Sequence, residues 1–315
     1  MRSVVESAVS VRGLTRHFGE IHAVDGLSFE VTPGELFGIV GPDGAGKTTT
    51  LRMLAGVLRP TSGDAVVQGV SVVRDPEGVK HHIAYMSQRF GLYSDLTVRE
   101  NIDFYADLFL VPRKARAARL ERLYQFSGLG PFESRLAGQL SGGMKQKLGL
   151  CCALIHEPQI MLLDEPTFGV DPISRRDLWL IVHEMVARGI TAVVSTAYLD
   201  EAERCDRLAL LHRGALLALD TPTAFQQRLA GHIQSLRSDA PRRARDLLEQ
   251  HPAVRHAVLF GDVIHLTLDD PRHDWPAVRA ALEHGGVTIL EAGPAEPSLE
   301  DVFIHLVGPG GVTHE

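Results

Sequence analysis

Residues 36–58 read LFGIVGPDGAGKTTTLRMLAGVL and contain the pattern G-x-x-x-x-G-K-[ST]. The apolar run Leu36–Val40 predicts a short buried strand, and Lys47–Leu58, closed by Pro60, predicts a helix. Between a strand and a helix, backbone N–H groups of such a loop bind phosphate oxygens, the lysine neutralises them and the threonine hydroxyl ligates Mg²⁺. We therefore expect a nucleotide phosphate site at Gly41, Pro42, Asp43, Gly44, Ala45, Gly46, Lys47, Thr48 and Thr49.

A second apolar run, Ile160–Leu163, ends in two carboxylates, Asp164 and Glu165. A strand that ends in acidic residues is the usual companion of a phosphate loop, because the phosphates bring a metal ion with them. We expect Asp164 to join Thr48 in the Mg²⁺ shell and Glu165 to orient or deprotonate the attacking water. The alternative is a strand whose exposed end is acidic by chance.

The segment LSGGMKQ at residues 140–146 indicates a second phosphate-facing surface. Ser141 is a natural N-cap, and Gly142 and Gly143 allow close approach to the start of a helix expected over 143–155. Ser-Gly-Gly by itself is also a common turn. With this segment the chain resembles the ATP-binding subunits of ABC transporters, because the phosphate loop, this signature and the acidic strand occur in that family's order and spacing. The resemblance is strong over residues 9–220.

The resemblance implies roles for three further residues. Phe18 matches the aromatic residue that stacks on adenine, and Gln88 matches the glutamine that links Mg²⁺ to the membrane partner. Asp171 lies in the loop that crosses the seam between two subunits. From the residues alone, Phe18 could instead be core, Gln88 could lie in a solvated loop, and Asp171 could only cap a helix beginning at Pro172.

One position departs from the family pattern. In the family each ATP lies between the phosphate loop of one subunit and the signature, here Ser141, Gly142 and Gly143, of another. After the strand expected at residues 191–195 the family usually has a histidine that contacts the γ-phosphate, and this chain has Ala197. Losing one such donor typically costs about 2.7 to 4 kcal/mol, or roughly 10² to 10³ in rate. We expect asymmetric pairing, in which the chain's own site is weakened while its signature completes a partner's site.

Three segments resemble the drug-resistance and ABC-2-type exporter branch: the run at residues 90–101, Met144 in the signature, and SLEDVF at residues 298–303. Within that branch the chain is similar to the N-terminal half of efflux ATPases whose two halves are fused. The implied cofactors are ATP and Mg²⁺. The implied partners are a bacterial ABC-2-type permease, a second cassette in a hetero- or homodimer, and a membrane-fusion subunit. The resemblance places the chain on the cytoplasmic face of the membrane, held there by the permease.

The order of expected elements predicts two domains. Strands alternate with helices over residues 160–211, which favours a parallel α/β sheet. A β-rich stretch at 65–73, broken at Gly69, predicts an antiparallel patch, and the region 96–155 reads as mostly helical. By resemblance, residues 1–220 form an α/β P-loop ATPase cassette with a RecA-like core and a helical subdomain. Residues 221–315 read as an α+β accessory domain with a hairpin at Phe260–Val263.

Composition excludes several classes. The 315 residues are 44% hydrophobic and 23% charged, which is ordinary for a globular protein. Three cysteines are too few for a disulfide framework and suit a reducing compartment. A net charge of −7 disfavours a nucleic-acid partner. The alternatives to a transporter ATPase are a soluble ABC ATPase acting on ribosomes or DNA, and an ATP-binding regulatory subunit with little hydrolysis.

Overall fold

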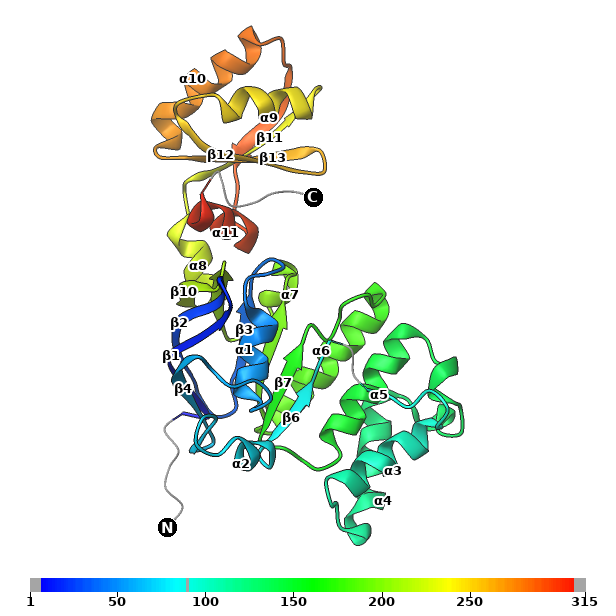
Figure 1. The fold of residues 1–315 in the computed structure, drawn as a ribbon. Helices are drawn as coiled ribbons and strands as arrows, with labels where there is room; N and C mark the ends of the chain where they lie inside the picture. The colour runs from blue at the N-terminus through cyan, green and yellow to red at the C-terminus, as the bar shows by residue number, and fades with distance from the viewer. Residues whose placement is uncertain (1–6, 89–90, 309–315) are drawn as a thin grey trace. The chain divides into compact units, whose positions relative to one another are not determined.

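The computed structural model describes residues 7–88 and 91–308 (Figure 1). Contacts within the chain divide it into two units, residues 1–219 and 220–315. The outer ends of the two expected domains, and Phe90 in the run at 90–101, lie outside the described residues. Within the described ranges, no helix combines the length and the apolar character that crossing a bilayer requires.

A six-stranded sheet, with strand order β10-β9-β3-β8-β7-β6, forms the centre of the first unit (Figure 1). Its strands are β3 (Leu36–Val40), β6 (Ile83–Met86), β7 (Ile160–Asp164), β8 (Thr191–Thr196), β9 (Arg207–His212) and β10 (Ala215–Asp220). β3 runs parallel to β8 and β9, and β7 runs parallel to β6 and β8. Every residue of β3, β7 and β8 is buried, as expected for strands covered on both faces. The predicted parallel sheet is confirmed.

A four-stranded sheet with the order β2-β1-β4-β5 lies on the other side of helix α1 (Lys47–Leu54). Its strands are β1 (Val9–Phe18), β2 (Ile21–Val31), β4 (Ser62–Val67) and β5 (Val70–Ser71). β1 pairs antiparallel with both β2 and β4. Since α1 contacts β2 and β4 of this sheet and β7 and β8 of the parallel sheet, one hydrophobic core joins all three layers. The antiparallel patch predicted at 65–73 corresponds to β4 and β5, and Gly69 between them has a φ of +80°.

The predicted C-terminal end of helix α1 was wrong. The helix ends at Leu54, not Leu58, and Ala55 is its C-cap. Gly56 has a φ of +66°, and a Cβ at this position would lie 2.7 Å from the carbonyl oxygen of Pro76. A left-handed glycine cannot continue the helix, so Gly56 and not Pro60 ends it.

The region expected to be helical contains three helices that pack together: α3 (Val98–Leu108), α4 (Arg113–Ser127) and α5 (Gly142–Leu154). It also contains the short 3₁₀ helices η1 (Gly130–Phe132) and η2 (Ala137–Gln139). Both α3 and α4 contact α5, which also contacts β6 and α6 (Pro172–Ala187). Helix α5 therefore connects the signature segment to the parallel sheet. The other helices of this unit are α2 (Pro76–Lys80) and α7 (Leu199–Ala202).

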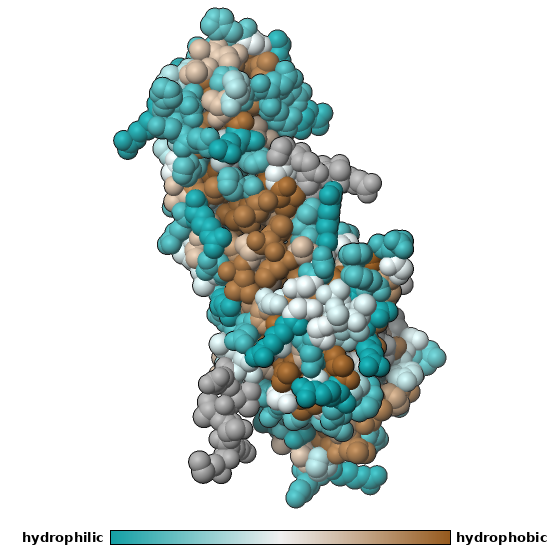
Figure 2. Space-filling view, turned by 60° about the vertical axis from the view of Figure 1, so that its left-hand side comes forward, coloured by the Kyte–Doolittle hydropathy of each residue, from teal (hydrophilic) through white to brown (hydrophobic). Residues whose placement is uncertain are grey.

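The second unit has its own four-stranded sheet, with the order β12-β13-β11-β14. Its strands are β11 (Ile233–Ser238), β12 (Val254–Phe260), β13 (Val263–Leu268) and β14 (Ile289–Pro294), and its helices are α8 (Pro222–Arg228), α9 (Pro241–Glu249), α10 (Pro271–His284) and α11 (Leu299–Val307). Helix α9 packs on β12, and a separate hydrophobic core lies beneath it. The predicted hairpin is confirmed, and Gly261 at its tip has a φ of +64°. Hydrophilic side chains cover much of this unit's visible face (Figure 2).

Candidate functional site

The loop between β3 and α1 is shaped by glycine. Gly44 and Gly46 have φ values of +75° and +99°, in the left-handed region that other residues rarely adopt. A Cβ on Gly41 would lie 2.2 Å from the carbonyl oxygen of Leu211, so only glycine fits there. Gly46 is the N-cap of α1 and supplies no side-chain cap. The first N–H groups of the helix therefore have no side-chain partner at the N-cap, an arrangement that suits phosphate.

Lys47 lies in this loop with only 4% of its side chain exposed. Its Nζ donates to the carbonyl oxygens of Gly41 at 2.8 Å and Pro42 at 3.1 Å. It also lies 3.1 Å from Oε1 of Glu165. The ammonium group is thus fixed at the centre of the loop and faces the candidate catalytic carboxylate.

Asp164 lies at the end of β7, where two hydroxyl groups bind its carboxylate. Thr48 Oγ1 on α1 donates to Oδ1 at 2.9 Å, and Ser195 Oγ on β8 donates to the same oxygen at 2.8 Å. Tyr85 lies with its hydroxyl 3.5 Å from Oδ2. Burial, and then the Asp164 charge, raise the pKa of Tyr85, so the phenol stays protonated. Thr48 and Asp164, two of the three residues expected at Mg²⁺, are therefore in direct contact.

Glu165 follows Asp164 in a left-handed conformation, with a φ of +47°. Its backbone N–H donates to Ser195, with the side-chain oxygen at 3.0 Å and the carbonyl oxygen at 3.2 Å. Its carboxylate accepts a hydrogen bond of 2.9 Å from Gln88 Nε2. Non-glycine residues in this region of φ are uncommon and concentrate at functional sites. The contacts from β8 hold the Glu165 backbone in this uncommon conformation.

A pocket of about 610 Å³ adjoins the phosphate loop and Glu165. Its lining comprises Ile21, His22, Ala23, Asp43, Gly44, Ala45, Gly46, Lys47, Thr48, Thr49, Gln88, Glu165 and Arg213. The volume is in the range of small-molecule sites. Ile21, His22, Ala23 and Arg213 were missed from the sequence, because they reach the pocket through β2 and the turn between β9 and β10. The sequence pattern predicts no element at either segment.

Phe18 lies at the end of β1 with 46% of its surface exposed. The guanidinium carbon of Arg16 lies 4.5 Å from the centre of its ring. The side chain is therefore outside the hydrophobic core, and its exposed ring can take part in stacking. It does not line the pocket of the phosphate loop.

The signature residues lie apart from that pocket, at the start of α5. Ser141 caps the helix as predicted and accepts a hydrogen bond from the backbone N–H of Met144 at 3.3 Å. Gly142 is the first residue of the helix. A Cβ on Gly143 would lie 2.2 Å from Oγ of Ser174 on α6. The signature helix and the start of α6 are therefore in close contact within one chain.

Asp171 caps α6, which begins at Pro172 as predicted. Its carboxylate accepts a 3.0 Å hydrogen bond from the backbone N–H of Ser174. Hydrogen bonds from Ser174 lower the pKa of Asp171, as expected for a carboxylate at a helix N-terminus. The capping role and a role at a subunit seam are compatible, because the cap uses one face of an exposed side chain.

Glu201 on α7 is a further residue that the sequence did not indicate. It is fully buried, and its Oε2 accepts hydrogen bonds from Thr167 at 2.9 Å and Thr196 at 2.8 Å. Its Oε1 lies 3.4 Å from Nε of Arg175 on α6. One carboxylate thus joins the loop after β7, the end of β8 and helix α6. Ala197, the departure from the family pattern, is the next residue after Thr196 and is exposed.

Comparison with known proteins agrees with this architecture. A family model described as ABC transporter matches residues 24–168. The probable multidrug ABC transporter ATP-binding protein YbhF of Escherichia coli (strain K12) is 42% identical over 320 aligned residues, covering 98% of this chain and 53% of YbhF. The chain spans about half the length of that relative. The daunorubicin resistance ATP-binding protein DrrA2 of Streptomyces coeruleorubidus is 34% identical, covering 96% of this chain and 95% of DrrA2.

The Nod factor export ATP-binding protein I of Burkholderia lata is 34% identical to this chain. The alignment covers 95% of this chain and 97% of that protein. A solved ATP-binding subunit of an ABC transporter superposes with a TM-score of 0.65 at 29% identity, covering 70% of this chain and 93% of that one. The dimeric, ADP- and phosphate-bound structure of the cassette MJ0796 superposes with a TM-score of 0.61 at 25% identity, covering 68% of this chain and 98% of that one. The fold is that of an ATP-binding cassette. The chain belongs to the ATP-binding proteins of the ABC transporter family.

Proposed function

We propose that this chain binds Mg·ATP at the phosphate loop, hydrolyses it to ADP and phosphate, and powers a bacterial ABC-2-type membrane exporter of drugs or other small molecules. The observation that carries the proposal is the clustering of Lys47, Thr48, Asp164, Glu165 and Gln88 around the loop. The relatives named for multidrug transport, Nod factor export and daunorubicin resistance support the export role.

The residues around Asp164 suit a magnesium ion. The Thr48 hydroxyl and the Asp164 carboxylate touch each other, and the Gln88 side chain supplies an amide oxygen. Hydroxyl, carboxylate and amide oxygens are the ligands that Mg²⁺ prefers. When bound, Mg²⁺ would neutralise charge on the β- and γ-phosphates. Glu165 would then orient or deprotonate the attacking water, and Lys47 would exchange its carbonyl contacts for phosphate oxygens.

We infer that a second cassette completes the site. Ser141, Gly142 and Gly143 do not line the pocket of the phosphate loop, so a signature from another chain would close over the nucleotide. With Ala197 in place of the expected donor, the chain's own site would be slow, while its signature can serve a partner. The pairing would be asymmetric, with Asp171 at the seam. The cassette of residues 1–220 carries this chemistry, and residues 221–315 form an accessory domain.

The permease would dock on the helical layer. A groove of about 340 Å³ is lined by Gln88 together with Leu92, Ser94, Ala137, Gly138, Lys145 and Gln146. Beside it Tyr93, Phe104 and Leu136 are exposed apolar side chains. A short cytoplasmic helix of an ABC-2-type permease fits such a surface, and Gln88 would connect it to Glu165. This docking would hold the chain on the cytoplasmic face of the membrane, alongside a membrane-fusion subunit.

Phosphate release by an Ala197→His variant tests the catalytic part of the proposal. If the site is otherwise competent, the histidine restores a donor to the γ-phosphate and raises the rate by roughly 10² to 10³. The control is Asp200→His, which adds a histidine to an exposed position in the same segment. A rate that Ala197→His leaves unchanged would instead favour a regulatory subunit that uses ATP as a structural ligand. Turnover at ordinary transporter rates by the unmodified chain alone would overturn the asymmetric pairing.

A further inference from the structure

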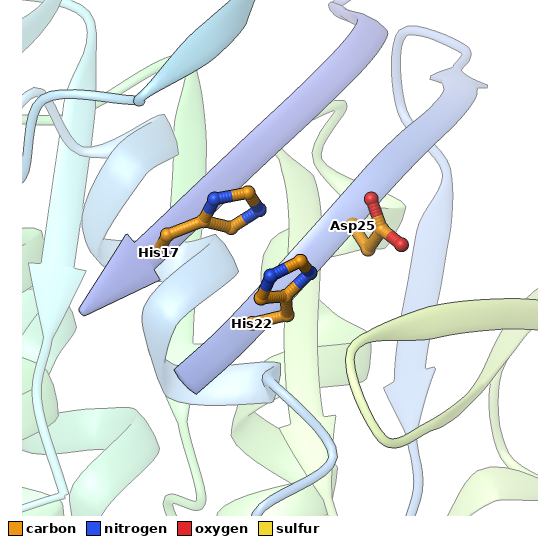
Figure 3. A group of neighbouring side chains, drawn as sticks. All are labelled: His17, His22 and Asp25. Carbon is orange, nitrogen blue, oxygen red and sulfur yellow. The ribbon is translucent and has the colours of Figure 1, made fainter. Parts of the chain in front are cut away.

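The hairpin of β1 and β2 carries three metal-ligating side chains close together (Figure 3). His17 on β1 and His22 on β2 are cross-strand partners, with ring centres 3.9 Å apart and planes inclined by 18°. Asp25 lies further along β2. One ligand atom from each of the three residues lies within 4.8 Å of the other two. The hairpin turn and the register of the strands thus bring the three side chains together.

Two polar groups of this cluster, on His17 and Asp25, have no partner among the described residues. The Nε2 atom of His17 is buried and has no hydrogen-bond partner. An unpartnered buried nitrogen costs free energy, so it is normally satisfied by something. Among residues 7–88 and 91–308, the Asp25 carboxylate has neither an ion-pair nor a hydrogen-bond partner. A carboxylate beside two imidazoles is a metal-ligand set.

We propose that His17, His22 and Asp25 form a binding site for a divalent first-row transition-metal ion of the zinc class. Two imidazole nitrogens and one carboxylate oxygen, with a fourth position open to water, make a common zinc ligand set. Tetrahedral coordination needs ligand atoms about 3.3 Å apart. His22 and Asp25 are exposed and can rotate to reach that spacing, whereas His17 is half-buried. Imidazole nitrogen selects this class over Mg²⁺, which prefers oxygen.

The metal site lies directly behind the phosphate loop. His22 and Ala23 line the nucleotide pocket. A Cβ on Gly46 would lie 2.4 Å from the carbonyl oxygen of Ala23, so the loop packs tightly on β2. The hairpin also carries Phe18. If adenine stacks there, which rests on the proposed function, a metal that ties β1 to β2 fixes that platform, and zinc binding and ATP binding become coupled.

Zinc titration in competition with a chromophoric chelator tests the site. The unmodified full-length chain is expected to take up one tightly bound Zn²⁺ that His22→Gln and Asp25→Asn each weaken at least about tenfold, because even the loss of an outer-shell partner costs that much. Both positions are exposed, so the fold is retained, and a thermal melt verifies it. His81→Gln, which removes an exposed histidine elsewhere, is the control and should bind as the unmodified chain does. Equal zinc affinity in all four proteins would overturn the site.

The coupling has a separate readout. The Kd for Mg·ATP is measured with and without buffered Zn²⁺ in the unmodified chain and in Asp25→Asn. The coupling is supported if Zn²⁺ shifts the Kd for Mg·ATP several-fold in the unmodified chain and leaves it unchanged in Asp25→Asn. An equal shift in both proteins would place the zinc effect elsewhere and overturn it. Tight zinc uptake by a chain that binds no Mg·ATP would leave the metal site standing and overturn the proposed function instead.

Discussion

Gln88 and Glu165 are in direct contact: the side-chain amide of the first donates to the carboxylate of the second over 2.9 Å. Gln88 is the second residue after β6, and it also lines the groove in the helical layer. A displacement at that groove therefore reaches the candidate base through one hydrogen bond. This contact gives the proposed permease a direct physical route to the chemistry.

Replacing Glu165 with glutamine should separate binding from hydrolysis. General-base catalysis contributes about 10²- to 10⁴-fold, so phosphate release should fall by that order while Mg·ATP binding persists. The measurements are single-turnover phosphate release and calorimetric Kd. Glu184→Gln, at an exposed carboxylate paired with Arg188, is the control. Retention of full activity by Glu165→Gln would remove this residue from its proposed role.

Adding a methyl group at Gly143 should destabilise the cassette, because its Cβ would lie 2.3 Å from Cβ of Ser174. Overpacking of this kind costs about 1 to 3 kcal/mol. Gly142→Ala is a matched control, since its Cβ would have only one neighbour, at 3.9 Å. Urea unfolding in a Trp275→Phe background, in which Trp179 is the remaining tryptophan, reports on this unit alone. Equal stability of the two alanine variants would contradict the packing described between α5 and α6.

Truncation of Glu201 should be among the more damaging substitutions in the cassette. Glu201→Ala leaves the hydroxyls of Thr167 and Thr196 without their acceptor and Arg175 without its carboxylate. Removing one partner of a buried ion pair costs about 3 kcal/mol or more. Glu201→Gln keeps the acceptor oxygen and should lose less, as measured by the same tryptophan-monitored unfolding. A glutamine variant no more stable than the alanine variant would argue against the hydrogen-bonding role.

The C-terminal unit should lose stability at acidic pH through Asp301. This residue closes a capping box with Ser298 on α11 and lies 3.0 Å from Nδ1 of His265. Burial opposes its ionisation, but the hydrogen bonds from His265 and Ser298 prevail, and its pKa falls below the ordinary 3.8. The pKa of Asp301 is lower in the folded protein than in the unfolded chain. The ionised carboxylate therefore makes its full contribution to the free energy of unfolding above the unfolded pKa, and this contribution is lost as the pH falls through the folded pKa.

Asp301→Asn should therefore cost about 1 to 2 kcal/mol at neutral pH and little below the folded pKa of Asp301. Hydrogen exchange of the α11 amides, compared between the two proteins at each pH, measures the difference. A difference that persisted unchanged at the lowest pH would assign the effect to packing and not to the charge.

The features that the sequence predicted well are local ones. The strand before the phosphate loop has the predicted bounds, because an apolar run specifies it. The hairpin of β12 and β13 turns at the predicted residues, because Gly261 permits the turn. β1 and β2 escaped prediction because bulges interrupt their alternation: register shifts follow Val11, Leu14 and Arg16. The helix predicted at residues 47–58 is too long, because its end at Gly56 depends on a left-handed φ that the apolar pattern does not reveal.

The residues of the candidate site likewise fall into those that the sequence predicts and those that it does not. The phosphate loop and the acids after β7 are contiguous in sequence and could be predicted as motifs. Glu201, Arg213 and His22 have no motif, and only the pairing of strands brings them to the pocket or to the loops beside it. The cap of α6 by Asp171 was predicted from the proline that follows it, but its contact with the signature helix through Ser174 depends on how the helices pack.

A single hydroxyl group sets the relative position of the two acids. Ser195 binds both the Asp164 side chain and the Glu165 backbone. If Asp164 and Glu165 have their proposed roles, a mutation at Ser195 alters metal affinity and water activation at once. Evolution could not tune these two properties independently by changing this residue, and a variation that separates them must arise at Thr48 or Gln88.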